Sequence, residues 1–100
     1  MHGMNVRVQV QSGKVEDAAR LLREVVMPSA ASYRGFIQNF LIVDAPHSRL
    51  TTLSVWATEA DAKAIYEDVG GQYQTAVAKL KPWLAAPPDA WMGPLSRVDK

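Results

Sequence analysis

Residues 53–61 read Leu-Ser-Val-Trp-Ala-Thr-Glu-Ala-Asp and join a strand to a helix. The apolar part of this stretch is typical of a strand that ends near Trp56. Thr58 is a favourable N-cap residue, and Asp61 follows at the position that the acid of a capping box occupies. The stretch therefore places a large indole at the end of a strand and beside a helix N-terminus, where it could form the wall of a small-molecule pocket.

Three strands are indicated around this junction. Alternation of valine with polar residues predicts a half-buried strand over residues 6–11. Residues 36–43, which read Phe-Ile-Gln-Asn-Phe-Leu-Ile-Val, predict a strand that is apolar on both faces and therefore covered on both sides. A turn at residues 44–48 separates it from the third strand, at residues 50–57, so we expect an antiparallel hairpin.

Helical periodicity accounts for much of the remaining chain. Residues 15–26 carry valine, alanine and leucine at helical spacing, and Pro28 is expected to end or kink this helix. A second helix is predicted from Glu59 to about Asp68, where Gly70-Gly71 interrupts it. A third helical segment carries an apolar stripe from Tyr73 to Leu80.

The two ends of the chain are expected to be less regular. Residues 1–4 are predicted to be flexible. Residues 87–100 are predicted to form an extended C-terminal segment with room for a short last strand, which Gly93-Pro94 would bend or confine to the edge of a sheet. Because we find no repeat and no low-complexity tract, residues 1–100 are interpreted as one domain.

This order of elements predicts an α+β fold with an antiparallel sheet and helices on one face. Helices can cover only one face of such a sheet. Because the strand at residues 36–43 is apolar on both faces, the other face should also meet a partner. A second copy of the same sheet, related by two-fold symmetry, is the simplest partner.

The composition narrows the class of protein. A hydrophobic fraction of 48% is typical of a globular chain and argues against disorder. The 11 Lys and Arg and 10 Asp and Glu are interspersed, which argues against a nucleic-acid partner. No apolar run approaches the roughly 20 residues of a membrane helix, and no signal peptide is visible, so a cytoplasmic protein is the simplest interpretation. The absence of cysteine excludes disulfides and thiolate ligands.

Each candidate site residue has a structural alternative. Trp56 either lines a pocket for a flat aromatic ligand or closes the strand–helix corner as a packing residue. Tyr66 and Tyr73 either offer their hydroxyls to a ligand or pack amphipathically with a hydrated tip. Asn39 is a polar residue inside an apolar strand, so it orients a ligand, pairs with the neighbouring strand or faces the barrel between two subunits.

Other polar residues give weaker indications. His47 lies in a Pro-His-Ser turn and is interpreted as a solvated loop residue, so no metal site is predicted. Arg34 and Arg49 either meet an anionic substrate at a pocket mouth or are solvated. Glu67 and Asp68 are adjacent on a helix and point about 100° apart, so they are not interpreted as a facing proton-transfer pair.

Four short stretches share the pattern of a known family. They are Gly13–Asp17 before the first helix, Tyr33–Phe36 before the second strand, Ser54–Ala62 at the strand–Trp–helix junction, and Tyr73–Leu80. In these stretches the chain resembles the antibiotic biosynthesis monooxygenase group of dimeric α/β-barrel proteins, over roughly residues 5–83. The resemblance implies a ferredoxin-like β-α-β-β-α-β unit whose antiparallel sheet joins that of a second copy, giving a homodimer with a shared barrel.

The resemblance also implies an activity. Cofactor-independent monooxygenases of this group let the anion of a phenol or quinol react directly with dioxygen in an apolar, dry pocket. The implied function is a monooxygenase that acts on an aromatic or quinol-type small molecule without a cofactor. The residues expected near the ligand are Trp56, Tyr66, Tyr73, Asn39 and Thr52. The alternative is a non-catalytic dimeric protein of the same fold that binds a small ligand or serves as a scaffold.

Three places depart from the family pattern. Many members carry a His-x-x-Ser/Thr-x-His pair at the end of the second helix, and residues 65–71 contain no histidine. Cofactor-free members place an asparagine four residues before the strand-end tryptophan, where this chain has Thr52. Haem-degrading relatives use a histidine on the third helical segment as iron ligand. Val77 lies near that place, so haem is not expected.

Overall fold

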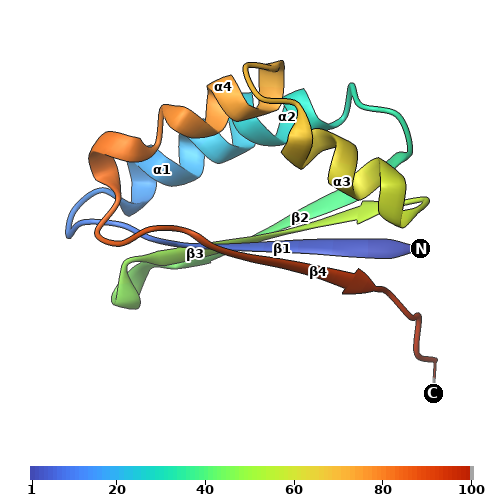
Figure 1. Ribbon diagram of the computed structural model, residues 1–100. Coiled ribbons are helices and arrows are strands. Elements are labelled where there is room, and N and C mark those ends of the chain that lie inside the picture. The colour runs from blue at the N-terminus through green and yellow to red at the C-terminus, as the bar shows by residue number, and fades with distance from the viewer. Residues whose placement is uncertain (100) are drawn as a thin grey trace.

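The computed structural model describes residues 1–99 and has two layers, a four-stranded sheet and a layer of helices on one of its faces (Figure 1). The strands are β1 (His2–Gln9), β2 (Phe36–Asp44), β3 (Arg49–Trp56) and β4 (Asp89–Pro94). They lie in the order β2-β3-β1-β4, and all neighbouring strands are antiparallel. The predicted antiparallel α+β fold is therefore confirmed, and the sheet of one chain is open and not a closed barrel.

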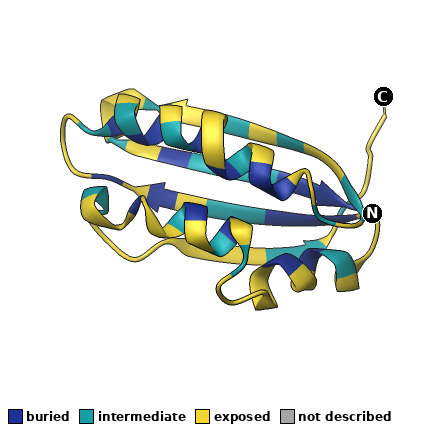
Figure 2. Ribbon diagram, turned by 90° about the horizontal axis from the view of Figure 1, so that it is seen from above, coloured by how far each residue is buried: buried dark blue, intermediate teal, exposed yellow. Residues whose placement is uncertain are grey.

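The helices follow the predicted order. They are α1 (Val15–Leu21), the π-helical turn η1 (Leu22–Val26), α2 (Met27–Ala30), α3 (Glu59–Glu67) and α4 (Gln72–Ala78), with 3-10 turns η2 (Ala45–His47) and η3 (Lys81–Trp83). The first three are consecutive, and we call them together the first helical segment. Seen from above, this segment and the α3–α4 region lie across the sheet as two neighbouring rows (Figure 2).

The junction between β3 and α3 forms as predicted. Thr58 caps α3, because its Oγ1 accepts a hydrogen bond from the backbone N–H of Asp61 at 3.1 Å. Gly35, with a φ of +81°, lies directly against this first turn, and a Cβ there would collide with the Asp61 carboxyl group. Glycine at this position therefore lets the chain enter β2 close to the start of α3.

Of the two outcomes expected at Pro28, an end or a kink of the helix, the structure shows no end at the proline. The segment continues to Ala30, and the π-helical turn lies immediately before the proline. Proline has no N–H for the carbonyl four residues earlier, and its ring crowds that carbonyl. The wider π turn before Pro28 makes room for the ring. Ser29 stabilises the region by donating its hydroxyl to the carbonyl oxygen of Val26 at 2.6 Å.

The N-terminal residues are also more regular than predicted. β1 begins at His2, four residues before the expected Val6, and His2, Gly3 and Met4 are buried. His2 pairs with Trp56 of β3 on one side and with Pro94 of β4 on the other. Residues 2–4 therefore belong to a central strand. The predicted last strand forms as β4, at the edge of the sheet.

The core lies between the sheet and the helices. Most even-numbered residues of β1 and β3 are buried or half-buried beneath the helices. Figure 2 shows buried segments on the strands and on the helices above them. The principal core members are Met4, Val8, Leu22, Val26, Leu50, Trp56, Ile65 and Leu80. The opposite face has no helices over it (Figure 1). On this face the exposed fractions of Phe40, Ile42 and Trp91 are 48%, 64% and 62%. The predicted cover on this side is therefore absent from a single chain.

Candidate functional site

An inner cavity of about 410 Å³ lies between the sheet and the helices. Its lining consists of Val6, Val8, Asn39, Thr52 and Ser54 on the sheet, Leu22, Val26, Met27 and Ala30 on the first helical segment, and Tyr73, Val77, Ala78, Leu80, Lys81, Leu84, Pro87 and Pro88 from α4 onward. Most of these side chains are aliphatic. The cavity is therefore an apolar chamber of the size that proteins use for small organic ligands.

Three polar side chains form the sheet side of this chamber. Asn39 of β2 pairs in register with Ser54 of β3, and Thr52 lies two residues earlier on the same face of β3. Asn39 donates Nδ2 to the carbonyl oxygen of Met27 at 3.2 Å, which leaves its second amide hydrogen for another acceptor. Among the hydrogen bonds of residues 1–99, none uses the Thr52 hydroxyl. We call Asn39, Thr52 and Ser54 the polar floor.

Trp56 lies beyond the polar floor and does not line the chamber. Its side chain is completely buried, and the ring of Phe36 meets it edge-on with centroids 5.6 Å apart. The indole Nε1–H donates to Ser54 Oγ at 2.9 Å, while the Ser54 hydroxyl lies 3.5 Å from the carbonyl oxygen of Met4. The indole thus packs in the core and orients Ser54, and the long contact to Met4 leaves the Ser54 O–H available to a ligand.

The two predicted tyrosines occupy different positions. Tyr73 lines the chamber and is buried, and this burial raises the pKa of its phenol to about 12, with a smaller contribution from Tyr66. Tyr73 is therefore a protonated hydrogen-bond donor at neutral pH. Tyr66 does not line the chamber and is partly exposed on α3. Its pKa is raised chiefly by burial, and the charge of Asp89 adds to that effect.

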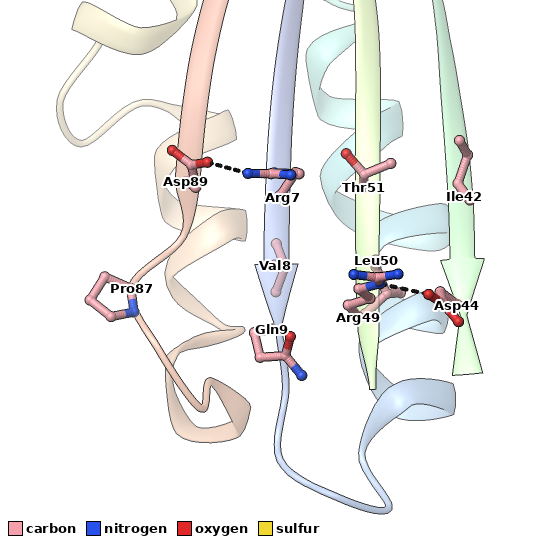
Figure 3. A pocket seen from close by; sticks show the side chains of 10 residues that line it. All are labelled: Arg7, Val8, Gln9, Ile42, Asp44, Arg49, Leu50, Thr51, Pro87 and Asp89. Atoms are coloured by element: carbon pink, nitrogen blue, oxygen red, sulfur yellow. Dashed lines mark hydrogen bonds and ion pairs between the residues drawn. The ribbon is translucent and has the colours of Figure 1, made fainter. Parts of the chain in front are cut away.

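A second hollow, of about 580 Å³, lies on the outer face of the sheet (Figure 3). Arg7 pairs with Asp89 at 2.9 Å, and Arg49 pairs with Asp44 at 2.6 Å. Figure 3 shows that the first pair joins β1 to β4 and that the second joins β3 to β2. Because both guanidinium groups already have carboxylate partners, this hollow offers less free charge to a ligand than its composition suggests.

The remaining predicted residues are distant from the chamber or engaged elsewhere. Asp44 accepts from both His47 and Arg49, and these contacts, led by that of His47, lower the pKa of the carboxyl group. Arg34 is exposed in the turn before β2. Asp68 accepts a hydrogen bond from the hydroxyl of Tyr33 at 2.8 Å, which links the loop before β2 to the α3–α4 connection.

Sequence reasoning missed two polar residues of the chamber, in addition to most of its aliphatic lining. Ser54 belongs to the polar floor, although a serine in a strand carries no signal of its own. Its register opposite Asn39 could have drawn attention to it, but that register requires the hairpin geometry. Lys81 is an exposed residue of the cavity lining. Nothing in the sequence distinguishes it from the other cations.

A sequence model of the family described as "Antibiotic biosynthesis monooxygenase" matches residues 1–65 of the chain. The protein belongs to this family. The match includes the strands that carry the polar floor and the junction at Trp56. Among curated proteins, none matches the chain at a significant level.

Solved structures agree with the antibiotic biosynthesis monooxygenase fold. NE2512, a protein of unknown function from Nitrosomonas europaea, superposes with a TM-score of 0.78 at 23% identity, covering 99% of this chain and 92% of its own. Rv0793 from Mycobacterium tuberculosis gives 0.72 at 16% identity, with coverages of 99% and 96%. SnoaB, a cofactor-independent oxygenase from Streptomyces nogalater, gives 0.75 at 12% identity, with coverages of 97% and 94%. At these sequence identities, the structural similarity establishes a shared fold.

Within residues 1–99, no three side chains of His, Cys, Asp or Glu come together as a metal-binding group. In the same range, no helix has both the length and the apolar character needed to cross a membrane.

Proposed function

We propose that the protein is a cofactor-independent monooxygenase that oxidises a flat aromatic substrate of the phenol or quinol type in the inner cavity. One observation carries this proposal, namely an apolar chamber of about 410 Å³ with a polar floor of Asn39, Thr52 and Ser54. The apolar walls suit aromatic rings, and the floor suits one oxygen atom of the substrate. Membership of the family supports the class of reaction.

In the proposed reaction the substrate itself supplies the electrons and releases its proton to solvent. Among the described residues that line the chamber, none is Asp, Glu or His, so the chamber offers no strong proton acceptor. An acidic substrate loses a proton to solvent, and its anion transfers electrons to dioxygen. For a methylene group between aromatic rings, one oxygen atom becomes the new carbonyl and the other leaves as water with the two hydrogens. This balance requires no further reductant.

The protein contributes by favouring the anion. The free amide hydrogen of Asn39 and the hydroxyls of Thr52 and Ser54 can donate to a phenolate oxygen. Tyr73 adds a donor that stays protonated, because burial raises its pKa to about 12. Hydrogen bonds to an anion are stronger in an apolar, water-poor chamber than in water. The substrate anion is thereby stabilised without a charged catalytic group inside the chamber.

We also propose that the protein is a homodimer joined through the outer face of the sheet. Phe40, Ile42 and Trp91 are about half exposed or more there, and no helix covers them. An isologous contact between two such faces would bury these side chains twice. The resulting pair of facing sheets corresponds to the barrel expected for this family.

Oxygen consumption tests the proposed activity. Anthrone and hydroquinone are incubated with the protein, and dioxygen uptake and absorbance are followed. Thr52→Val should lower the rate about tenfold, the loss typical of one hydrogen bond to a charged group. Thr51→Val is the matched control, because Thr51 directly precedes Thr52 on β3 but does not line the inner cavity. Its hydroxyl donates a hydrogen bond to the carbonyl oxygen of Val6 instead. Thermal stabilisation by these compounds without oxygen uptake would favour the binding-only alternative.

A further inference from the structure

The opening of the inner cavity has a distinct composition. Most of the lining is buried or half-buried, but Ala78, Lys81, Pro87 and Pro88 are exposed. These residues belong to the end of α4, to η3 and to the segment that leads into β4. The exposed part of the lining therefore marks the mouth between α4 and the β4 segment.

Lys81 gives this mouth a positive charge. In the described part of the chain, the lining of the cavity contains one lysine and no other charged residue. The ion pairs within residues 1–99 do not include Lys81. The mouth therefore differs from the hollow on the outer face, where each arginine already has a carboxylate partner. An uncompensated ammonium group beside an apolar chamber attracts an anion.

We propose that the preferred ligand of the cavity is an aromatic carboxylate that bears a ring hydroxyl at its far end. This inference rests on the proposed function, because it concerns the same chamber. The rings occupy the apolar chamber, and the hydroxyl meets the polar floor of Asn39, Thr52 and Ser54. The carboxylate stays at the mouth beside Lys81. In this position the carboxylate keeps part of its hydration, so the large cost of burying a charge is avoided.

The structure also disfavours two other classes of ligand. A second carboxylate at the inner end would be desolvated on a floor that offers hydrogen bonds but no cation. A ligand without any acidic group would leave the Lys81 charge unused. The match is therefore to a molecule that is neutral and hydroxylated at one end and anionic at the other.

Equilibrium dialysis with a matched pair of probes tests this inference. The acid is a hydroxynaphthoic acid whose two groups lie at opposite ends of the ring system, and the neutral probe is the corresponding amide. The wild-type protein should bind the acid about fivefold more tightly, the upper range of an exposed ion pair. This preference should shrink as salt is added, because salt screens a pair at the mouth.

Two variants locate the source of the preference. Lys81→Met keeps a long apolar side chain and removes the charge, so it should bind the acid and the amide equally. Lys79→Met is the matched control, because Lys79 is exposed two residues away and does not line the cavity. It should keep the wild-type preference. Equal binding of both probes by the wild type, or a preference that survives Lys81→Met, would overturn the inference.

The same assay separates this inference from the proposed function. If the acid is preferred through Lys81 but no hydroxylated acid supports oxygen uptake, the ligand class stands and the oxygenase activity fails. If anthrone is oxidised while acid and amide bind equally, the activity stands and the ligand class fails. If neither probe binds and Ala78→Trp, which narrows the mouth, leaves oxygen uptake unchanged, the cavity is not the site and both proposals fail.

Discussion

Each face of the sheet carries a few side chains that depart from the usual distribution, in which apolar groups are covered and polar groups are exposed. The covered face carries Asn39, Thr52 and Ser54, while the uncovered face exposes Phe40 and Ile42. Neighbouring residues of one strand, such as Asn39 and Phe40, thus face the helices and the uncovered side respectively. Buried polar groups need partners, and exposed apolar patches usually meet another surface. This arrangement supports the proposed ligand site on the inner face and the proposed assembly surface on the outer face.

The inner face tolerates its polar floor because helices and core residues surround it. Trp56 supplies an N–H to Ser54 at 2.9 Å, and the carbonyl oxygen of Met27 receives the amide of Asn39. On the outer face, the charged residues gather at one end as the pairs Arg7–Asp89 and Arg49–Asp44 (Figure 3). Away from these pairs, the outer face exposes Phe40 and Trp91, which suits contact with a second sheet.

The largest expected effect is that of Trp56→Ala on the inner face. Truncation of a completely buried indole should lower the free energy of unfolding by about 3–5 kcal/mol, because it leaves a void in the core. It should also release the Ser54 hydroxyl from the indole N–H. Urea denaturation of dilute protein measures the loss. Trp91→Ala is the control, since Trp91 is mostly exposed on the outer face. Equal losses for the two variants would remove the distinction between the faces.

The second effect concerns assembly. Ile42→Asp places a charge on the exposed apolar part of the outer face, on the edge strand β2, where Ile42 is 64% exposed. In an isologous contact the change occurs twice, so the dimer dissociation constant should rise at least about a hundredfold, or about 2.7 kcal/mol. Sedimentation over a dilution series measures it. Val69→Asp, on the exposed loop after α3, should leave assembly unchanged. A wild-type monomer at all concentrations would contradict the dimer.

A third effect should appear in alkaline solution. The pKa of Tyr73 is raised to about 12 in the folded protein, against about 10 in an unfolded chain. Below pH 10 the phenol is protonated in both states, and stability is unaffected. Between about pH 10 and 12 the unfolded state loses its proton first, so about 2–3 kcal/mol of stability is lost. Tyr73→Phe should show a flatter decline in urea denaturation. The same slope in both proteins would show that the phenol is not buried.

The smallest expected effect is a gain. Thr52→Asn restores the amide that cofactor-free members of the family place four residues before the strand-end tryptophan. On the polar floor this amide should raise the rate of anthrone oxidation about threefold to tenfold, because it adds a donor to the substrate anion. Thr51→Asn, on the outer face, should not change the rate. A loss of activity in Thr52→Asn would indicate that Asn39 already provides the amide and that the chamber has no room for a second.

Local patterns predicted much of the fold. The alternation of apolar and polar residues, the Thr58 cap and the short turn between β2 and β3 are all encoded by near neighbours, and each forms as expected. The start of β1 was predicted four residues late, because His2 to Met4 are ordered by pairing with distant strands on both sides. The passage of the first helical segment through Pro28 depends on a π-helical turn that has no sequence signature of its own.

The candidate site was less predictable than the fold. Asn39 could be recognised because a polar residue interrupts an apolar strand. The partner of the Trp56 indole could not be predicted, since the contact with Ser54 depends on side-chain rotamers within the folded core. Lys81 reaches the cavity only because the chain turns at η3 after α4. Features that arise from the meeting of distant segments were therefore the ones missed.

Oxygen labelling tests whether the protein oxygenates a substrate with dioxygen in the inner cavity. Anthrone is incubated with the protein under isotopically labelled dioxygen, and the product is analysed by mass spectrometry. We expect one labelled oxygen atom in the product, formed at a rate that depends on the protein. Ala78→Trp, which narrows the mouth of the cavity, should slow this reaction strongly, and Ala64→Trp, on the exposed side of α3, should not. Labelled product at the same rate with Ala78→Trp, or no protein-dependent labelling, would contradict the inner cavity as the site of oxygenation.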